Sequence, residues 1–100
     1  MRLDWSAHAI ADRNRIFDYI EQDRPRAAIS VDDRIREETT SLVSFPERGR
    51  LGRVDGTREL VISGTPYIVV YCVLRENVLI LRVLHGAQQW PDKLQFKESE

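Results

Sequence analysis

The chain is poor in the residue types on which many chemical sites depend, with one cysteine and two histidines among 100 residues. Cys72 alone cannot form an internal disulfide, which favours a reducing compartment. His8 and His85 lie far apart in the sequence, so they and the cysteine form no recognisable metal-ligand cluster. The stretch GRLGRVDG lacks the Lys-Ser/Thr pair of a phosphate-binding loop. We therefore expect neither a metal nor a cofactor.

Long apolar runs are missing as well. No run approaches the ~20 residues that a membrane-spanning helix needs. The N-terminal stretch MRLDWSAHA has no apolar region of the kind found in secretory signals. Hydrophobic residues nevertheless make up 42% of the chain, which is typical of a globular protein and too high for a disordered one. We expect a single cytoplasmic domain over residues 1–100, with no membrane partner.

Neither sign of charge dominates, since 15 Lys and Arg residues stand against 16 Asp and Glu residues, for a net charge of -1. This balance does not favour nucleic acid, because that binding depends on displacing counterions from phosphates. Thirteen of the 15 cations are arginines, whose planar guanidinium suits carboxylates and phosphates. Four of them gather within residues 46–58, namely Arg48, Arg50, Arg53 and Arg58. This segment is interpreted either as a solvated loop or as a binding surface.

Apolar residues recur at helical spacing in the first half of the chain. Ser6 is a good N-cap, and the apolar residues that follow it predict a helix over residues 7–22. The residues on its apolar face are Ile10, Phe17 and Ile20, supported by Ala7 and Ile16.

A second helix is expected directly afterwards, with Asp23 as its N-cap and Pro25 in its first turn. It should end near Phe45, because Pro46 disfavours helical backbone in the residue before it. Its apolar face consists of Ala28, Val31, Ile35 and Leu42. The short turn between the two helices predicts an antiparallel helical hairpin.

Three apolar runs rich in β-branched residues follow a loop expected over residues 46–57. They are RELVIS, PYIVVYCVL and NVLILRVLH, which together span residues 58–85. Their short connections suit hairpins, so they predict an antiparallel meander. A further short strand is expected over residues 2–5. The order of elements predicts an α+β fold, with an N-terminal strand and an antiparallel helical hairpin packed on an antiparallel β-sheet.

The last run carries a charge in its middle, at Arg82. Alternate residues of a regular strand share a face. One face would carry Leu79, Leu81, Val83 and His85, and the other Val78, Ile80, Arg82 and Leu84. We expect the aliphatic set to face the helices, which places Arg82 on the uncovered face. There it would form a salt bridge to Glu59 or another acid across the sheet, or contact a target.

Two blocks, SFPERGRLGRVDGTRELVISGTPYIVVY and ILRVLHG, occur in the order and at the spacing of a known family. Through them the chain resembles the RelE/ParE superfamily of bacterial toxins, and within it the ParE-like, plasmid-stabilisation branch. The resemblance covers nearly the whole chain. It implies a toxin of a type II toxin–antitoxin module, neutralised by a cognate antitoxin in a hetero-oligomer. The implied fold is the one expected above.

The resemblance implies one of two activities. RelE-like members cleave messenger RNA on the ribosome, whereas ParE-like members poison DNA gyrase by binding. RNA cleavage needs groups that move protons and cations that hold the phosphorane charge. RelE-like members place Lys and Arg at positions that here hold Glu59, Val61, Ile68 and Ala87. Their catalytic set is therefore missing, which favours inhibition of gyrase and growth arrest without catalytic residues.

Two alternatives stay open. A related nuclease subgroup uses a histidine with a carboxylate, and here that role would fall to His85, Arg82 and Glu59. The third hypothesis is a non-toxic protein that regulates its own operon while bound to its antitoxin. Under the leading hypothesis, the candidates for target contact are Arg48, Arg50, Arg53, Arg58, Arg82 and Trp90, because Arg and Trp dominate interface hot spots. The charged segment 91–100 is expected to be a flexible tail.

Overall fold

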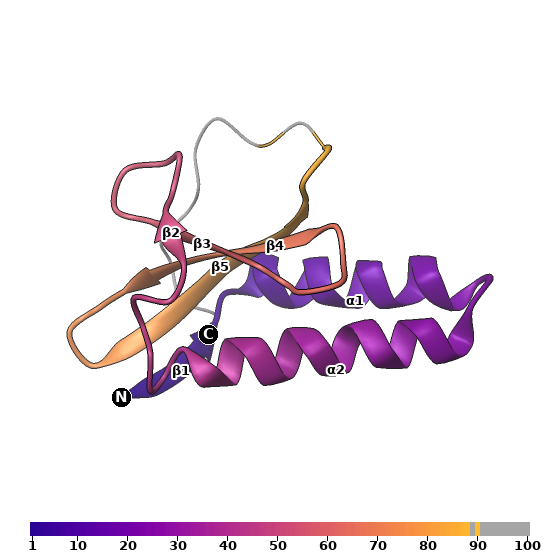
Figure 1. The fold of residues 1–100 in the computed structure, drawn as a ribbon, viewed down its shortest axis with the longest axis horizontal. Helices are drawn as coiled ribbons and strands as arrows, with labels where there is room; N and C mark the ends of the chain where they lie inside the picture. Colours follow the sequence, from indigo (N-terminus) through magenta and orange to yellow (C-terminus); the bar gives the residue numbers. More distant parts are fainter. Residues whose placement is uncertain (89, 91–100) are drawn as a thin grey trace.

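The computed structural model describes residues 1–88 and 90 and shows an α+β fold in which two helices lie on one face of a sheet (Figure 1). The helices are α1 (Ala7–Glu21) and α2 (Pro25–Ser41). The strands are β1 (Arg2–Trp5), β2 (Arg50–Leu51), β3 (Arg58–Val61), β4 (Tyr67–Val73) and β5 (Asn77–His85). The predicted fold class is confirmed. The expected tail over residues 91–100 lies outside the described residues.

The sheet is mixed rather than antiparallel throughout. Its strand order is β1-β5-β4-β3-β2, and β3, β4 and β5 form the predicted antiparallel meander. β1 runs parallel to β5, with Leu3 opposite Val78. No hairpin joins these two strands, so the antiparallel direction is not imposed on them. At the other edge, Arg50 of β2 pairs with Glu59 of β3, in a segment for which the sequence predicts only a loop.

The N-terminus of α1 lies where it was predicted, but the buried face of the helix differs from the predicted apolar face. The Ser6 hydroxyl accepts the Ala9 N–H at 3.0 Å and donates to the Leu81 carbonyl at 2.8 Å, so it caps the helix and ties it to β5. Ala9 is fully buried, and Ile20 packs against the core. Ile10 is 43% exposed, so the prediction that it belongs to the core is wrong.

The apolar face predicted for α2 is confirmed, whereas both of its ends differ. Ala28, Ile35 and Leu42 are buried. The N-cap is Arg24 rather than Asp23, because Pro25 occupies the first helical position and the residue before it becomes the cap. The helix ends at Ser41, before Phe45, because the backbone tightens into turns with hydrogen bonds three residues back.

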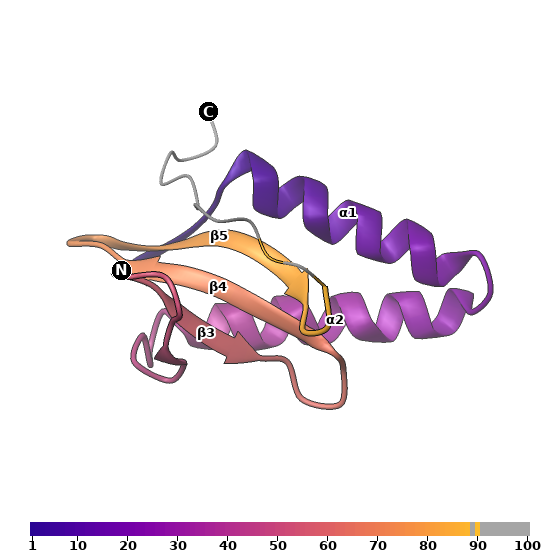
Figure 2. The same cartoon turned by 90° about the horizontal axis from the view of Figure 1, so that it is seen from above.

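Both faces of the central strands are covered. Seen from above, β4 and β5 run alongside α1, with α2 beneath them (Figure 2). The cluster on the helix side includes Tyr67, Val69, Tyr71, Val78, Ile80 and Val83 from β4 and β5. The smaller cluster on the other side is formed by Val70, Cys72, Leu79, Leu81 and Leu84, with Val54 and Trp90 packed against it.

A β-bulge in β5 overturns the predicted faces of that strand. Val70 pairs with Arg82, but the next residue, Tyr71, pairs with Ile80, so β5 carries one extra residue at this point. Ile80 therefore faces the helices together with Val83, whereas Leu79 and Leu81 lie on the other side. The apolar residues on both sides of Arg82 give no sign of such a bulge, since both faces of the strand are buried.

The partner of Arg82 is Asp12 of α1, not Glu59 across the sheet. The Nε and Nη2 atoms of Arg82 donate to the Asp12 carboxylate at 2.7 and 3.0 Å. The same carboxylate accepts the Val83 N–H at 3.0 Å, so it also satisfies the edge of β5. These hydrogen bonds to the Asp12 carboxylate raise the pKa of Arg82. This charge in an apolar strand thus holds α1 against the sheet.

Candidate target-binding face

Two of the arginines proposed for target contact hold the segment of residues 46–50 in place. Arg48 donates to Ser41 Oγ at 2.7 Å and to a carboxylate oxygen of Glu38 at 3.2 Å. Arg58 donates to the Gly49 carbonyl at 2.8 Å. These bonds tie the segment to α2 and to β3. Both guanidinium groups are therefore engaged in holding the segment that leads into β2.

Tyr71 fixes the same segment from beneath, which the sequence did not indicate. Its hydroxyl donates to the Pro46 carbonyl at 2.8 Å and accepts the Gly49 N–H at 2.8 Å. A Cβ at Gly49 would lie 2.7 Å from that hydroxyl oxygen, so only glycine allows this approach. Burial raises the pKa of Tyr71. The hydroxyl thus stays protonated and keeps donating at neutral pH.

Arg50 and Arg53 converge on the buried carboxylate of Glu59. Arg50 Nη2 donates to Glu59 Oε1 at 3.0 Å, and Arg53 donates to Oε2 through its backbone N–H at 2.8 Å and its Nε at 3.2 Å. Burial alone would raise the pKa of Glu59, but the hydrogen bonds from Arg53 and Arg50 outweigh it and the pKa lies below its ordinary value. Glu59 is 3% exposed, and these hydrogen bonds keep its carboxylate ionised despite that burial.

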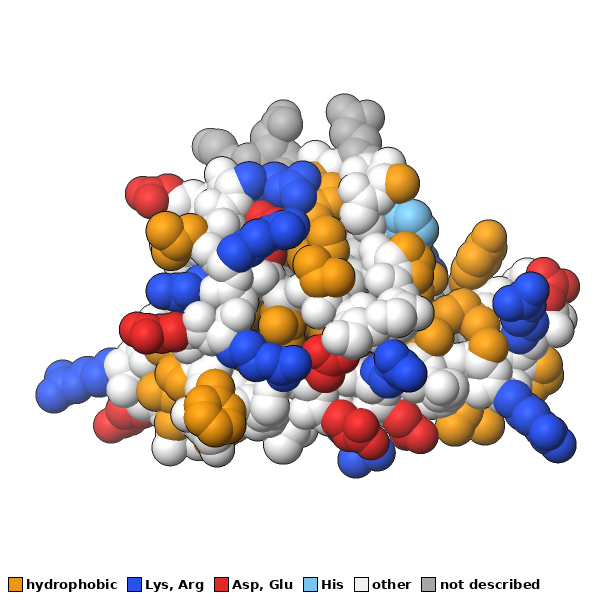
Figure 3. Space-filling model, in the orientation of Figure 1, with side chains coloured by type: hydrophobic (Ala, Val, Ile, Leu, Met, Phe, Trp, Pro, Cys, Tyr) orange, Lys and Arg blue, Asp and Glu red, His pale blue; other side chains and the backbone are white. Residues whose placement is uncertain are grey.

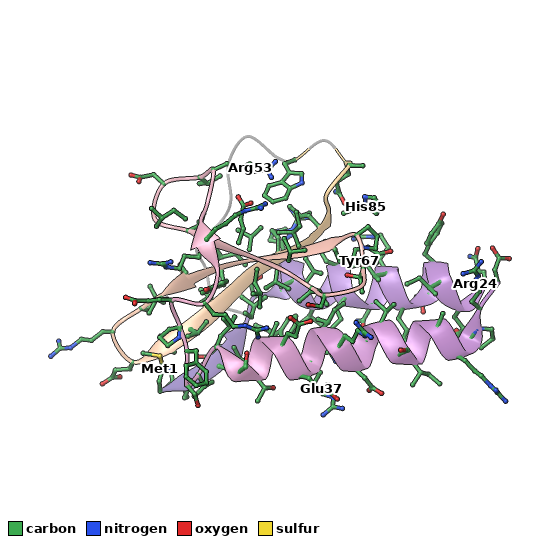
Figure 4. The ribbon with its side chains drawn as sticks, in the orientation of Figure 1. Met1, Arg24, Glu37, Arg53, Tyr67 and His85 are labelled. Atoms are coloured by element: carbon green, nitrogen blue, oxygen red, sulfur yellow. The ribbon has the colours of Figure 1, made fainter. Side chains whose placement is uncertain are left out.

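Trp90 completes this arrangement. The Arg53 guanidinium carbon lies 3.5 Å from the centroid of the Trp90 ring, a close cation–π contact. The indole N–H of Trp90 donates to the His85 carbonyl at 3.3 Å. In Figure 4, Arg53 lies on the side of the sheet away from the helices. We call the side chains of Arg50, Arg53 and Trp90 the Arg–Trp face.

The Arg–Trp face contains three of the six residues predicted to contact a target. In the space-filling view, arginine side chains lie beside hydrophobic ones over the part of the molecule that holds β2 (Figure 3). Glu59, beneath them, was predicted as a possible catalytic group or as a salt-bridge partner of Arg82, and not as the partner of Arg50 and Arg53. An acid at an inward position of a short apolar strand was the available signal, because a buried carboxylate requires cations near it.

The three residues of the nuclease hypothesis, Glu59, Arg82 and His85, do not meet in one site. Val70 pairs with Glu59 on one side and with Arg82 on the other, which puts their Cα atoms about 10 Å apart. Each is bound to a different partner, as described above. His85 accepts the Ala87 N–H on Nδ1 at 3.0 Å and packs edge-on against Tyr67 with ring centroids 5.6 Å apart. Through these two contacts, His85 stabilises the turn at the end of β5.

The part of the chain that the structure describes holds neither a metal-binding cluster nor a membrane-spanning helix. Within residues 1–88 and 90, no three His, Cys, Asp or Glu side chains are grouped so that they could hold a metal ion. In the same residues, neither helix has the length and apolar character needed to cross a membrane.

Comparison with known proteins agrees with this fold. The family model for the ParE toxin of the type II toxin–antitoxin system parDE matches residues 3–90. The "Putative toxin Y4kP" of Sinorhizobium fredii is 43% identical over 93 residues, covering 93% of this chain and 96% of that protein. Toxin RelE2 of Caulobacter vibrioides is 40% identical over 84 residues, covering 84% and 93%.

A solved structure is also similar. The chromosomal ParDE TA system from P. aeruginosa matches with a TM-score of 0.78 and 28% identity, covering 85% of this chain and 95% of that one. The matched family region includes α1, α2 and the strands that carry the Arg–Trp face. The chain therefore belongs to the ParE toxin family of type II toxin–antitoxin systems.

Proposed function

We propose that this toxin arrests growth by binding DNA gyrase, without cleaving RNA. The observation that carries the proposal is the state of Glu59. Its carboxylate is buried, ionised and hydrogen-bonded to Arg50 and Arg53. A carboxylate held in this way is a poor general acid or base at neutral pH, because its pKa is too low and its oxygens are occupied. The same bonds order two arginines beside Trp90, an arrangement suited to binding.

The charge of the chain supports the same proposal. A toxin that grips ribosomal RNA gains affinity from a positive excess that displaces counterions. Here the net charge is -1. The arginines that flank Glu59 and the one in β5 form ion pairs within the protein, which reduces their pull on phosphates.

The proposal includes an antitoxin partner and a toxin–antitoxin hetero-oligomer. Membership of a toxin–antitoxin family supports this, as does the similarity to a chain of the P. aeruginosa ParDE system. Co-expression with the cognate antitoxin should restore growth, and the two chains should purify together. Growth arrest that persists in the presence of that protein, with no complex recovered, would count against this partner.

The target is tested by pulse labelling after the toxin is induced alone. We expect thymidine incorporation to stop before methionine incorporation, because inhibited gyrase blocks replication first. Purified toxin should also inhibit supercoiling by purified gyrase. If methionine incorporation stops first, the toxin acts on translation, and the ribosome replaces gyrase as the target. If neither changes, the protein is not a poison, and regulation of its own operon becomes the better proposal.

His85→Ala separates binding from catalysis. Growth arrest by this variant should equal that of the unmodified toxin, because the proposed mechanism uses no imidazole. Loss of arrest in a variant that remains folded and accumulates normally would make His85 a catalytic candidate.

A further inference from the structure

The Arg–Trp face combines exposure with order, which is unusual for arginine side chains. The Arg50 and Arg53 side chains are 57% and 50% exposed, yet each is held by Glu59 from below. An arginine has five N–H donors, and the side-chain bonds to Glu59 engage one donor of Arg50 and two of Arg53, its Nε at 3.2 Å and its Nη2 at 3.4 Å. The remaining edge of each guanidinium can therefore meet a partner's acceptors without leaving Glu59.

Trp90 adds an apolar anchor whose orientation is also fixed. Arg53 covers one side of its ring, and the bond to the His85 carbonyl sets the direction of the indole. Long side chains normally lose rotamer freedom when a complex forms, and this loss weakens binding. On the Arg–Trp face much of that freedom is already lost in the unbound protein.

We infer that the Arg–Trp face binds an acidic segment of the protein target, and that Glu59 is a positioning residue for this contact. The inference rests on the proposed function in taking gyrase as the target. Paired guanidinium groups beside an indole suit partner carboxylates that flank an apolar side chain. A net charge of -1 for the whole chain favours such a local acidic segment over the extended charge of a nucleic acid.

Glu59 itself cannot be a contact residue, because it is 3% exposed. Its effect on binding must pass through the arginines. Replacing it with glutamine removes the negative charge while nearly preserving the shape. The amide then offers one oxygen acceptor, and its NH₂ group faces donors. Arg53 should leave its position over Trp90 in this variant, although the exposed surface keeps every residue that would touch a target.

The binding experiment uses single substitutions, so that one arginine always remains beside the buried carboxylate. Affinity for DNA-free gyrase is measured for Arg53→Gln, Trp90→Ala and Glu59→Gln. We expect each to bind at least about tenfold more weakly. Arg75→Gln is the matched control, because it removes the same charge from an exposed arginine in the β4–β5 turn, and its affinity should change less than about twofold. Unchanged affinity of Arg53→Gln and Trp90→Ala, with both folded, overturns the inference.

A spectroscopic measurement distinguishes positioning from a general loss of structure. In a Trp5→Phe background, Trp90 is the remaining tryptophan of the chain, so its emission reports the contact with Arg53. Glu59→Gln and Arg53→Gln should shift this emission in the same direction, while the far-ultraviolet circular dichroism stays unchanged. If Glu59→Gln weakens binding and leaves the Trp90 emission as it was, the positioning role is refuted.

Failure of the inference can be told apart from failure of the proposed function. If the unmodified toxin does not bind gyrase, the proposed function fails, and the same variants are then scored by growth arrest. Loss of arrest in Arg53→Gln and Trp90→Ala, but not in Arg75→Gln, supports the face as the target surface whatever the target is. Unchanged arrest overturns it. Binding of a short DNA duplex or RNA strand that these variants weaken would overturn the acidic protein partner.

Discussion

Replacing Asp12 with alanine should be among the most damaging single changes in this protein. The substitution removes the acceptor for two hydrogen bonds from Arg82 and for the backbone N–H of Val83. Removing one member of a buried ion pair costs about 3–5 kcal/mol. Arg82 is 23% exposed, so water can solvate it in part and the lower end of that range applies. The unpaired N–H adds about 1 kcal/mol, and the helix propensity of alanine offsets about half of that.

The expected loss is thus about 3.5 kcal/mol of the free energy of unfolding. For a chain of 100 residues this corresponds to a decrease in Tm of about 14–28 °C. Urea unfolding followed by circular dichroism measures the loss directly. Asp33→Ala is the control, because it breaks an exposed ion pair with Arg36 and should cost less than about 0.5 kcal/mol.

Two further variants test the reasoning behind this number. Asp12→Asn keeps an oxygen for the Val83 N–H and should therefore be more stable than Asp12→Ala. The double variant Asp12→Ala/Arg82→Met leaves only the exposed Arg15 without its Asp12 partner, and should also be more stable than Asp12→Ala alone. If Asp12→Ala costs no more than the Asp33→Ala control, the Asp12 carboxylate does not hold α1 to the sheet, and the reasoning is wrong.

Three other outcomes are expected. Tyr71→Phe removes a hydroxyl that bonds two backbone groups and should cost about 1–3 kcal/mol in urea unfolding; a loss below 0.5 kcal/mol would contradict that bridge. Gly64→Ala should destabilise more than Gly56→Ala, since both have positive φ but only at Gly64 would the added Cβ meet Arg34, at 2.6 Å. Equal thermal shifts would show that Arg34 moves aside freely. Glu59 has a lowered pKa, so its stabilising effect is complete above the ordinary value of 4.5 and is lost as pH falls through the lowered folded pKa. The free energy of unfolding should therefore fall less steeply at acid pH for Glu59→Gln than for the unmodified protein. Parallel plots of this free energy against pH for the two proteins would exclude Glu59 as a source of acid sensitivity.

The sequence predicts the elements of this fold better than their partners. Ser6 and the periodic residues of α2 define the helices because capping and apolar spacing are local properties. The parallel pairing of β1 with β5 depends on contacts across most of the chain, which no local pattern encodes. The bulge beside Arg82 is equally hidden, since both faces of β5 are apolar around it. In the sequence, Asp12 is an ordinary polar residue of a helix, and only the structure shows that it lies beside β5.

Residue type selected the candidates for the site, and the contacts in the structure distinguish their roles. Arginine and tryptophan content drew attention to six residues, and the sequence alone did not distinguish their roles. Arg48 binds the end of α2 and Arg82 binds α1, whereas Arg58 binds the Gly49 carbonyl. Only Arg50 and Arg53 share the carboxylate of Glu59. The difference lies in which acceptors the fold brings to each guanidinium, and these acceptors come from separate elements.

The pairing of the first strand with the last also sets when this protein can finish folding. Ser6 bonds the Leu81 carbonyl 75 positions later, and Asp12 bonds Arg82 at a separation of 70 positions. Closing loops of this length slows folding, because their entropy is lost before the contacts form. During synthesis, β1 has no partner until nearly all of the chain has left the ribosome. The contacts that hold β1 and α1 to the sheet can therefore form only after β5 has emerged.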